Sequence, residues 1–265
     1  MSIPKKIHYV WLGDNPLPES DQKYIEGWQE KNPDFSIHRW SEKNVDISKY
    51  PLVQKALDEK RWALGADIIR MIVIYNEGGI YLDTDIELLK SLDTDIIMPD
   101  SSKKKLTDFD AFACWESDFW FTTAAFGAKA HSPWIEKILK RYELADIEQK
   151  IVTETFLKTV HSPSVYAKDI FGLELDGQTR VYGNNNLLTL GSEYFCPKHY
   201  MTGEMNITPN TIAVHHYAST WHTKIEKLKN ELVKDSYKTL GPEKYKFFEK
   251  RYNAKLEKEI RKELP

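Results

Sequence analysis

The sequence predicts an α/β protein of one domain, built on a doubly wound sheet. Two observations carry this prediction. Short apolar runs typical of buried strands alternate with longer segments whose apolar residues recur every three or four positions, as on one face of a helix. The chain has 265 residues, of which 12% are aromatic, and is therefore long enough to bury one large core.

The first half of the chain alternates strands and helices in an order that builds such a sheet. Pro51 stands at the first turn of a helix, a position that proline tolerates well. Gly78 and Gly79 end the longest of these helices, because glycine takes a left-handed conformation at the lowest cost. The expected elements are, in order, a strand (7–12), a helix (20–31), a strand (35–40), two helices (51–58 and 61–76) and a strand (80–82).

The second half adds paired strands and ends in helices. Alternating residues predict the strand pair, and an amphipathic pattern that begins at Pro133 predicts a helix. A stretch rich in Gly, Asn and Pro predicts loops and edge strands. The last helical pattern is broken at Gly241 and Pro242. The expected elements are two strands (110–115 and 119–128), a helix (133–149), loops and edge strands (162–211), a strand (212–214) and helices from residue 222 onward.

Two aspartates directly follow the strand at residues 80–82, in the sequence Asp83-Thr84-Asp85. Residues i and i+2 of a strand face the same way, roughly 6 to 7 Å apart, so the two carboxylates can converge on one cation. Ligands in open α/β sheets bind beyond the carboxyl ends of strands, which is where this pair lies. Carboxylate oxygens suit Mg²⁺ and Mn²⁺, which also bridge to nucleotide phosphates. We therefore expect Mn²⁺, or Mg²⁺, at this pair.

A charged pair lies among apolar residues in the preceding helix. Asp67 and Arg70 are three residues apart and project from one side of it, where they must be solvated, paired or bound to a ligand. A second Asp-Thr-Asp, at residues 93–95, follows a segment with no strand pattern. Because turns attract aspartate for local hydrogen bonds, we interpret this second copy as a turn.

Three separated blocks resemble one known family. They are the opening Ile3–Gly13, the segment Ala63–Asp85 and the closing His215–Trp221, in that order. Together they resemble glycosyltransferase family 32, which includes bacterial capsule enzymes and yeast mannosyltransferases, and they are similar to the glucosylating domain of large clostridial toxins. The resemblance implies a GT-A type, Rossmann-like single domain (residues 1–222) with a mixed central sheet flanked by helices. Residues 223–265 are then a C-terminal helical extension packed on it.

The resemblance also implies roles for particular residues. Asp83 and Asp85 are the catalytic, metal-binding pair. For a third metal ligand we choose His216 over His215, because the toxins place a glutamate at the matching position and because adjacent strand residues point to opposite faces. The other expected substrate-binding residues are Trp11 for the nucleotide base, Asp67 and Arg70 for ribose and sugar hydroxyls, Tyr81 for support of the nucleotide, and Ser219 and Trp221 for the diphosphate. From the residues alone, the apolar content around Trp11 favours a core side chain, and the resemblance reverses that preference.

The implied reaction moves a hexose from a nucleotide-diphosphate sugar, UDP-linked rather than GDP-linked, to a hydroxyl of a glycan or lipid-linked oligosaccharide. It retains the anomeric configuration and serves capsule or exopolysaccharide synthesis. Thr123 stands where family members often carry asparagine, which leaves a donor contact at that strand in question. No catalytic base is assigned. Two other classes stay open: a metal-dependent nucleotide-sugar phosphohydrolase, and a non-catalytic module that binds sugar nucleotides or glycans.

The charge and the cysteine content limit the binding partners and the cellular compartment that the sequence predicts. The net charge of −3 argues against a nucleic-acid binder, which needs a basic surface. Residues 224–265 are nevertheless basic, with thirteen Lys and Arg against eight acids, so contact of these helices with the anionic inner face of a membrane is an alternative to simple packing. Cys114 and Cys196 lack motif spacing and predict thiols in a reducing compartment. With no secretion-signal pattern and no apolar run of roughly 18 residues, the expected location is the cytoplasm.

Overall fold

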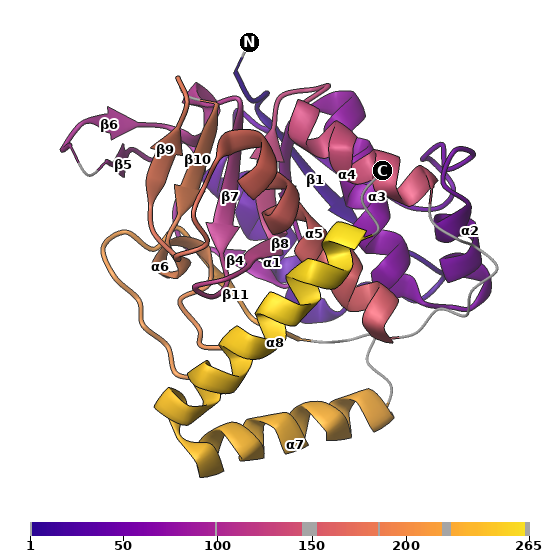
Figure 1. Ribbon diagram of the computed structural model, residues 1–265. Coiled ribbons are helices and arrows are strands. Elements are labelled where there is room, and N and C mark those ends of the chain that lie inside the picture. The colour runs from indigo at the N-terminus through magenta and orange to yellow at the C-terminus, as the bar shows by residue number, and fades with distance from the viewer. Residues whose placement is uncertain (1, 99, 145–152, 185, 219–223, 263–265) are drawn as a thin grey trace.

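A seven-stranded mixed sheet lies at the centre of the protein (Figure 1). The computed structural model of the chain describes residues 2–98, 100–144, 153–184, 186–218 and 224–262. In order across the sheet, the strands are β2 (Ser36–Trp40), β1 (Lys6–Val10), β3 (Gly79–Leu82), β8 (Phe121–Ala128), β7 (Ala111–Trp115), β10 (Leu187–Leu190) and β9 (Arg180–Tyr182).

The directions of these strands decide where a site can form. β1 runs parallel to β2 and to β3, whereas β8 is antiparallel to both β3 and β7. His8 of β1 lies opposite Tyr81 of β3, so both strands end at the same edge of the sheet. That edge carries Trp11 and Asp83, the residues that follow the two strands. The mixed sheet flanked by helices confirms the expected fold class.

The two faces of the sheet bury two separate cores. Along β7, Ala111, Ala113 and Trp115 face one core, and Phe112 and Cys114 face the other, as the two-residue period of a strand requires. The first core lies under α2 (Pro51–Asp58), α3 (Trp62–Glu77), α4 (Pro133–Glu143) and α5 (Thr153–Phe171). The second lies under α1 (Glu19–Lys31), α6 (Ser192–Phe195) and the small antiparallel pair of β4 (Ile86–Leu88) and β11 (Ala213–His215).

Two expected boundaries in the second half of the chain are wrong. The helix expected over residues 133–149 ends at Glu143 in α4, and residues 145–152 lie outside the part of the chain that the structure describes. α5 then continues to Phe171, through a stretch that we expected to be loop. Pro163 is tolerated inside α5 because the carbonyl of Thr159, which its missing N–H would have bonded, accepts from the Ser162 hydroxyl at 3.0 Å and the Tyr142 hydroxyl at 3.2 Å.

The C-terminal helices form a hairpin beside the sheet. α7 (Lys224–Leu240) and α8 (Pro242–Lys262) are joined at Gly241, whose φ of +74° is favourable for glycine. α8 packs along α5, whereas α7 lies apart from the sheet (Figure 1). None of the helices within the described ranges is both long enough and apolar enough to cross a membrane.

The short strands β5 (Ile96–Ile97) and β6 (Lys103–Lys104) lie at one edge of the molecule (Figure 1), and the second Asp-Thr-Asp comes directly before β5. Asp93 ion-pairs with Lys5 at 3.2 Å and with Lys105 at 2.9 Å, as a surface turn would. Cys114 and Cys196 are both buried free thiols. A 3₁₀ turn (Leu106–Asp108) follows β6.

His8 is a buried polar side chain that ties β1 to the end of α3. Its Nε2 lies 2.9 Å from the carbonyl of Gly78, and its Nδ1 accepts a hydrogen bond from Trp40 Nε1 at 3.0 Å. A Cβ on Gly79 would come within 2.8 Å of the same ring, which excludes larger residues there. Burial lowers the pKa of His8 to about 4. The ring is therefore held neutral, with its proton on Nε2.

We expect the free energy of unfolding to decrease as the pH falls from 7 towards 4. The unfolded chain takes up a proton at His8 near pH 6.5, and the folded chain does so only near pH 4, so acid favours the unfolded state. The effect amounts to about 3 kcal/mol, and the pKa of His161, which is half-buried, is lowered in the same direction. Titration of the imidazole signals by NMR measures the pKa of His8 separately from those of the other histidines. A midpoint for His8 near 6.5 would contradict the assignment.

Candidate active site

The Asp83-Thr84-Asp85 turn connects β3 to β4 at the edge of the sheet. The Asp83 N–H donates to the carbonyl of Ala124 at 2.8 Å and continues the pairing of β3 with β8. Between the two aspartates, the Thr84 hydroxyl donates to Oδ2 of Asp21 at 2.6 Å, and both residues are buried. This anchor on α1 turns Thr84 away from the aspartates and fixes the turn in one conformation.

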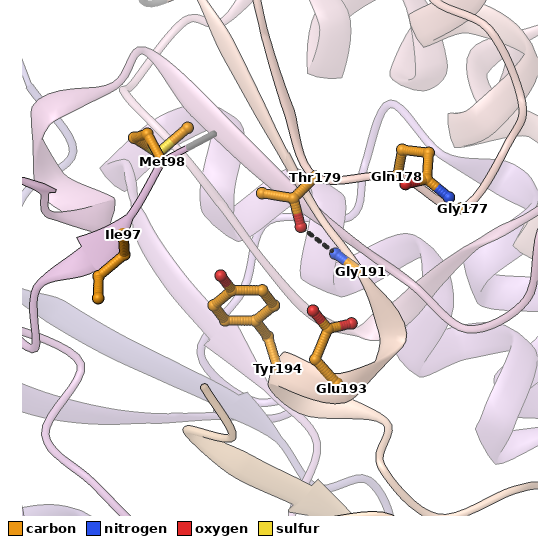
Figure 2. Close-up of a pocket in the computed structure, with 8 residues that line it drawn as sticks. All are labelled: Ile97, Met98, Gly177, Gln178, Thr179, Gly191, Glu193 and Tyr194. Carbon is orange, nitrogen blue, oxygen red and sulfur yellow. Dashed lines mark hydrogen bonds between the residues drawn. The ribbon is translucent and has the colours of Figure 1, made fainter. Parts of the chain in front are cut away.

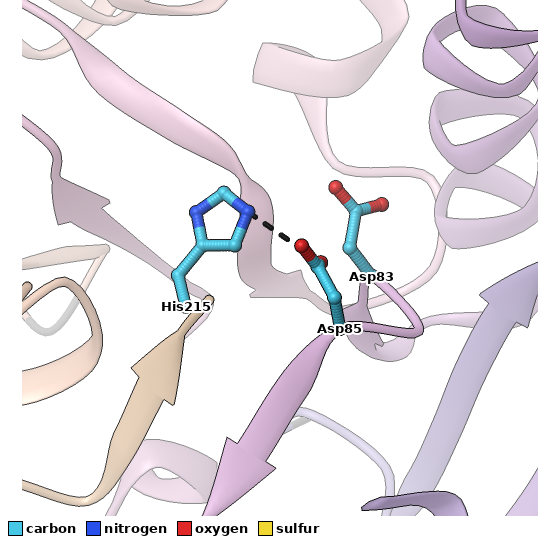
Figure 3. Close-up of side chains that lie close together, drawn as sticks. All are labelled: Asp83, Asp85 and His215. Carbon is cyan, nitrogen blue, oxygen red and sulfur yellow. Dashed lines mark ion pairs between the residues drawn. The ribbon is translucent and has the colours of Figure 1, made fainter. Parts of the chain in front are cut away.

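His215 lies beside the two aspartates (Figure 3). β11 pairs antiparallel with β4 and places His215 opposite Ile86, directly after the turn. His215 Nε2 is 3.5 Å from Asp85 Oδ1. One ligand atom from each of Asp83, Asp85 and His215 lies within 4.8 Å of the others. A segment more than a hundred residues away in sequence thus joins the aspartate pair.

His216 does not join this group, in contrast to our expectation. Its backbone N–H donates to the Asp85 carbonyl at 3.2 Å, and its side chain points the other way. The ring stacks on Tyr24, with 5.0 Å between centroids, and its Nε2 lies 2.8 Å from a carboxylate oxygen of Glu87. Adjacent strand residues point to opposite faces, so only one of the two histidines can face the aspartates. The register of β11 on β4 selects His215.

The chain after β11 helps to orient Asp85. Tyr217 has a φ of +56°, which is uncommon for a bulky side chain. This conformation brings the backbone N–H of Ala218 to Asp85 Oδ2, at 2.8 Å. Asp85 is therefore held by a hydrogen bond on one oxygen and faces His215 with the other.

Arg70 of α3 connects the helix to the turn. Its Nη2 lies 2.8 Å from Asp67 Oδ1 and 3.2 Å from Asp83 Oδ1, and its guanidinium stacks 4.7 Å over the ring of Tyr81. Its Nη1 donates to both the carbonyl and the hydroxyl of Thr123, at 2.6 and 2.8 Å. With 3% of its surface exposed, Arg70 serves as the counter-charge for two buried carboxylates.

Asp67 retains one free acceptor. Its Oδ2 is buried and has no hydrogen-bond partner among the described residues. Burial raises the pKa of Asp67 to about 7, even though Arg70 lowers it. Because buried acceptors are normally satisfied, an unpaired oxygen beside the sheet edge is a candidate contact for a ligand hydroxyl.

A divalent cation fits the three-residue group. Burial also raises the pKa of Asp85, because the positive charge near the carboxylate does not fully offset the loss of solvent. A bound cation would supply that charge. Tyr81 and Arg70 both contact Oδ1 of Asp83 and leave its Oδ2 for another ligand. Opposed ligands on a Mg²⁺-sized ion lie about 4.2 Å apart. The three ligand atoms, which lie within 4.8 Å of one another, would have to draw closer together around such an ion.

The other predicted substrate-binding residues divide into three cases. Trp11 is partly exposed at the same sheet edge, and its Nε1 donates to the Asn15 carbonyl at 2.7 Å. Tyr81 is fully buried and donates to Asp83 at 2.7 Å, so its support of a ligand passes through that carboxylate. Ser219 and Trp221 lie outside the described residues.

Sequence reasoning missed two side chains that hold the site together. Asp21 reaches Thr84 across 63 residues of sequence, and an aspartate in the first turn of a helix is common enough to give no signal. Thr123 did give a signal, as a departure from the family pattern. The structure shows that it holds Arg70.

Two cavities in the described part of the chain lie away from this group. One, of about 330 Å³, lies between the β5 segment and α6, where Glu193, Tyr194 and Thr179 face it and the Gly191 N–H donates to the Thr179 hydroxyl at 2.9 Å (Figure 2). The other, of the same size, lies between α3 and α4 and includes Tyr50 and Glu143. Neither cavity contains Asp83, Asp85 or His215. The chemistry of the donor set, rather than cavity size, identifies the candidate site.

One family profile matches part of the chain. Its description is "Glycosyltransferase sugar-binding region containing DXD motif", and it matches residues 18–104. That segment is about a third of the chain. It includes Asp67, Arg70 and the aspartate pair, but neither Trp11 nor His215. A search of curated proteins finds no match.

Solved structures extend the similarity to the fold. The PaToxG glycosyltransferase matches with a TM-score of 0.50 and 18% identity, over 65% of this chain and 72% of its own. The UDP-bound glycosyltransferase domain of the YGT toxin gives 0.41 and 12%, over 66% and 69%. A glycosyltransferase involved in glycosylation of the major capsid of PBCV-1 gives 0.40 and 9%, over 86% and 98%. The chain is thus similar to the DXD sugar-binding region over residues 18–104, and its fold is similar to that of the PaToxG glycosyltransferase.

Proposed function

We propose that the protein is a metal-dependent glycosyltransferase that moves a hexose from a nucleoside diphosphate sugar to a hydroxyl of a glycan. The observation that carries this proposal is the convergence of Asp83, Asp85 and His215 where β3 ends. The partial match to a DXD sugar-binding region supports the same reaction class. We favour UDP over GDP as the nucleotide of the donor.

In this proposal Asp83, Asp85 and His215 hold a divalent cation. When bound, the cation neutralises the charge that develops on the diphosphate leaving group. An imidazole in the donor set favours Mn²⁺ over Mg²⁺, which prefers oxygen ligands only. Three protein ligands leave coordination positions for phosphate oxygens.

The surrounding residues bind and orient the donor. Asp67 offers its unpaired Oδ2 to a ribose or sugar hydroxyl. Arg70 and Tyr81 hold Asp83 in place through their contacts with Oδ1. The exposed face of Trp11 stacks on the base, and Ser219 and Trp221 contact the diphosphate, as the resemblance to the toxin domains implies.

The finer features of the reaction rest on the family resemblance. They are retention of anomeric configuration, and an acceptor that is a capsule or exopolysaccharide repeat, free or lipid-linked. We assign no catalytic base, because no side chain of the site has been placed against an acceptor hydroxyl. The anomeric configuration of the product, read by proton NMR, tests retention separately from activity.

A panel of UDP-glucose, UDP-galactose, UDP-N-acetylglucosamine and GDP-mannose tests the proposed function. With Mn²⁺ present, we expect one UDP-sugar to release UDP, faster when a glycan acceptor is added and not at all after chelation of the metal. A phosphohydrolase would instead release nucleoside monophosphate or sugar phosphate, independently of acceptor. Binding of a sugar nucleotide without release of any product would identify a non-catalytic module. Either of these two results would refute the transferase.

A further inference from the structure

Helix α8 has one face on the body of the protein. Leu256 and Ile260 are buried against Trp120 and Val165, which fixes the rotation of the helix about its axis. Residues three, four or seven apart share a face of a helix, whereas residues two apart lie on nearly opposite faces. The side of α8 opposite Leu256 and Ile260 therefore faces away from the body.

The charges of α8 that reach the body are paired. These contacts supplement the apolar packing and leave little net charge at the junction with α5 and the β7–β8 turn. The ion pairs are Lys246 with Asp118 (2.6 Å), Arg261 with Asp169 (2.8 Å), and Glu257 with Lys168 (3.2 Å) and Arg261 (3.0 Å).

The opposite face of α8 is a row of cations, which we call the basic face. Its members follow one another at spacings of seven, four, three and four residues, and all are exposed: Lys244, Arg251, Lys255, Lys258 and Lys262. Lys262 pairs with Glu259 at 2.7 Å. Lys244, Lys255 and Lys258 form no ion pair with any residue that the structure describes. The basic face is thus a line of largely uncompensated positive charge.

Large aromatic rings adjoin the basic face. Phe247 and Phe248 are 58% and 55% exposed, and their rings contact each other edge to face, with centroids 5.8 Å apart. The Arg251 guanidinium lies 5.8 Å over Phe247. On α7, the other arm of the hairpin, Leu228 and Leu232 are four residues apart and also more than half exposed. Exposed apolar side chains grouped in this way mark an interaction surface rather than ordinary solvent-facing residues.

We propose that the basic face of α8, with Phe247 and Phe248, docks on the surface of an anionic lipid bilayer. Cations on a helix attract anionic headgroups, and aromatic rings beside them enter the boundary between headgroups and acyl chains. The helix lies in the plane of the membrane, and its body-facing side keeps its packing on α5. A glycan acceptor carried on a lipid would then be presented at the same surface.

A bilayer explains this surface better than a nucleic acid does. The rest of the chain carries an excess of acidic residues, which would repel a nucleic acid long enough to extend beyond the hairpin. Paired phenylalanines also gain from burial in a bilayer interface. The combination of unpaired cations and unburied rings on one helix is the chemistry of a peripheral membrane contact.

The test is sedimentation of the full-length protein with lipid vesicles. We expect binding to vesicles of phosphatidylcholine mixed with phosphatidylglycerol, little binding to phosphatidylcholine alone, and weakening by salt. Replacing Arg251, Lys255 and Lys258 with glutamine should weaken binding about 100-fold, at about fivefold per cation. Replacing Phe247 and Phe248 with serine should weaken it about tenfold or more.

A matched control changes the same charge on the body of the protein. Lys49→Gln, Lys60→Gln and Lys103→Gln, all at exposed positions, should leave vesicle binding unchanged. All variants should keep the far-ultraviolet circular dichroism and Tm of the parent, because none of these side chains is buried. Equal binding to neutral and anionic vesicles, no binding to either, or an equal loss in the control would overturn the proposal. So would retention on heparin without binding to vesicles, which would assign the face to an acidic macromolecule.

Discussion

Asp85→Asn should abolish metal-dependent release of nucleoside diphosphate, with a loss of about 1,000-fold or more. Asparagine keeps the shape of the side chain and can still accept from the Ala218 N–H, but it removes the negative charge that a cation needs. The free energy of unfolding should stay close to that of the parent. Burial raises the pKa of Asp85 in the protein without metal, so removing its charge should not lower the free energy of unfolding. The measurement is steady-state turnover with saturating Mn²⁺, alongside chemical denaturation.

The second Asp-Thr-Asp provides a matched control for this variant. Asp95→Asn makes the same chemical change in the same motif, at a residue that pairs with Lys103 near the surface. We expect it to leave turnover within about twofold of the parent, since it touches nothing at the site. Comparable turnover in Asp85→Asn and the parent would remove the cation from the proposed reaction.

Arg70→Met should lower the free energy of unfolding by about 3 to 5 kcal/mol. Methionine fills much of the volume of the arginine side chain but leaves the buried carboxylates of Asp67 and Asp83 without their counter-charge. Two hydrogen bonds to Thr123 are lost as well. Urea denaturation at neutral pH measures the change. Turnover should also fall, because the position of Asp83 depends on Arg70.

Arg261→Met is the control for the stability change. Arg261 also contacts two carboxylates, Asp169 and Glu257, but about a third of its side chain is exposed. Ion pairs of this kind contribute about 1 kcal/mol or less. If Arg70→Met proved no more destabilising than Arg261→Met, then Arg70 would not be the buried counter-charge that we infer.

The fold class and the main site motif could be predicted from local sequence patterns. A strand followed directly by Asp83-Thr84-Asp85 is a local feature, which is why the aspartate pair could be found, although the structure holds both aspartates in a turn between β3 and β4 and not on the strand itself. The same holds for Asp67 and Arg70, which one turn of helix brings together. In the structure Arg70 pairs with Asp67 and also contacts Asp83, a contact that the helical spacing alone does not predict.

The parts that could not be predicted depend on contacts between distant segments. The choice between His215 and His216 is set by the register of β11 on β4, and nothing within β11 encodes that register. The contact of Asp21 with Thr84 depends likewise on how α1 packs against the turn. The prediction of a loop at Pro163, where α5 in fact continues, was wrong for a different reason. The rescue of the Thr159 carbonyl by neighbouring hydroxyls is invisible to a rule that treats proline as a helix breaker.

Binding of Mn²⁺ in the presence of UDP, followed by electron paramagnetic resonance, tests the central claim most directly. If Asp83, Asp85 and His215 hold the cation, His215→Ala should weaken Mn²⁺ binding by at least about 10- to 100-fold, the loss seen when a residue that only orients a ligand is removed. His216→Ala should leave binding nearly unchanged, because His216 faces Tyr24 and Glu87. Unchanged Mn²⁺ affinity in His215→Ala, or a larger loss in His216→Ala, would contradict it.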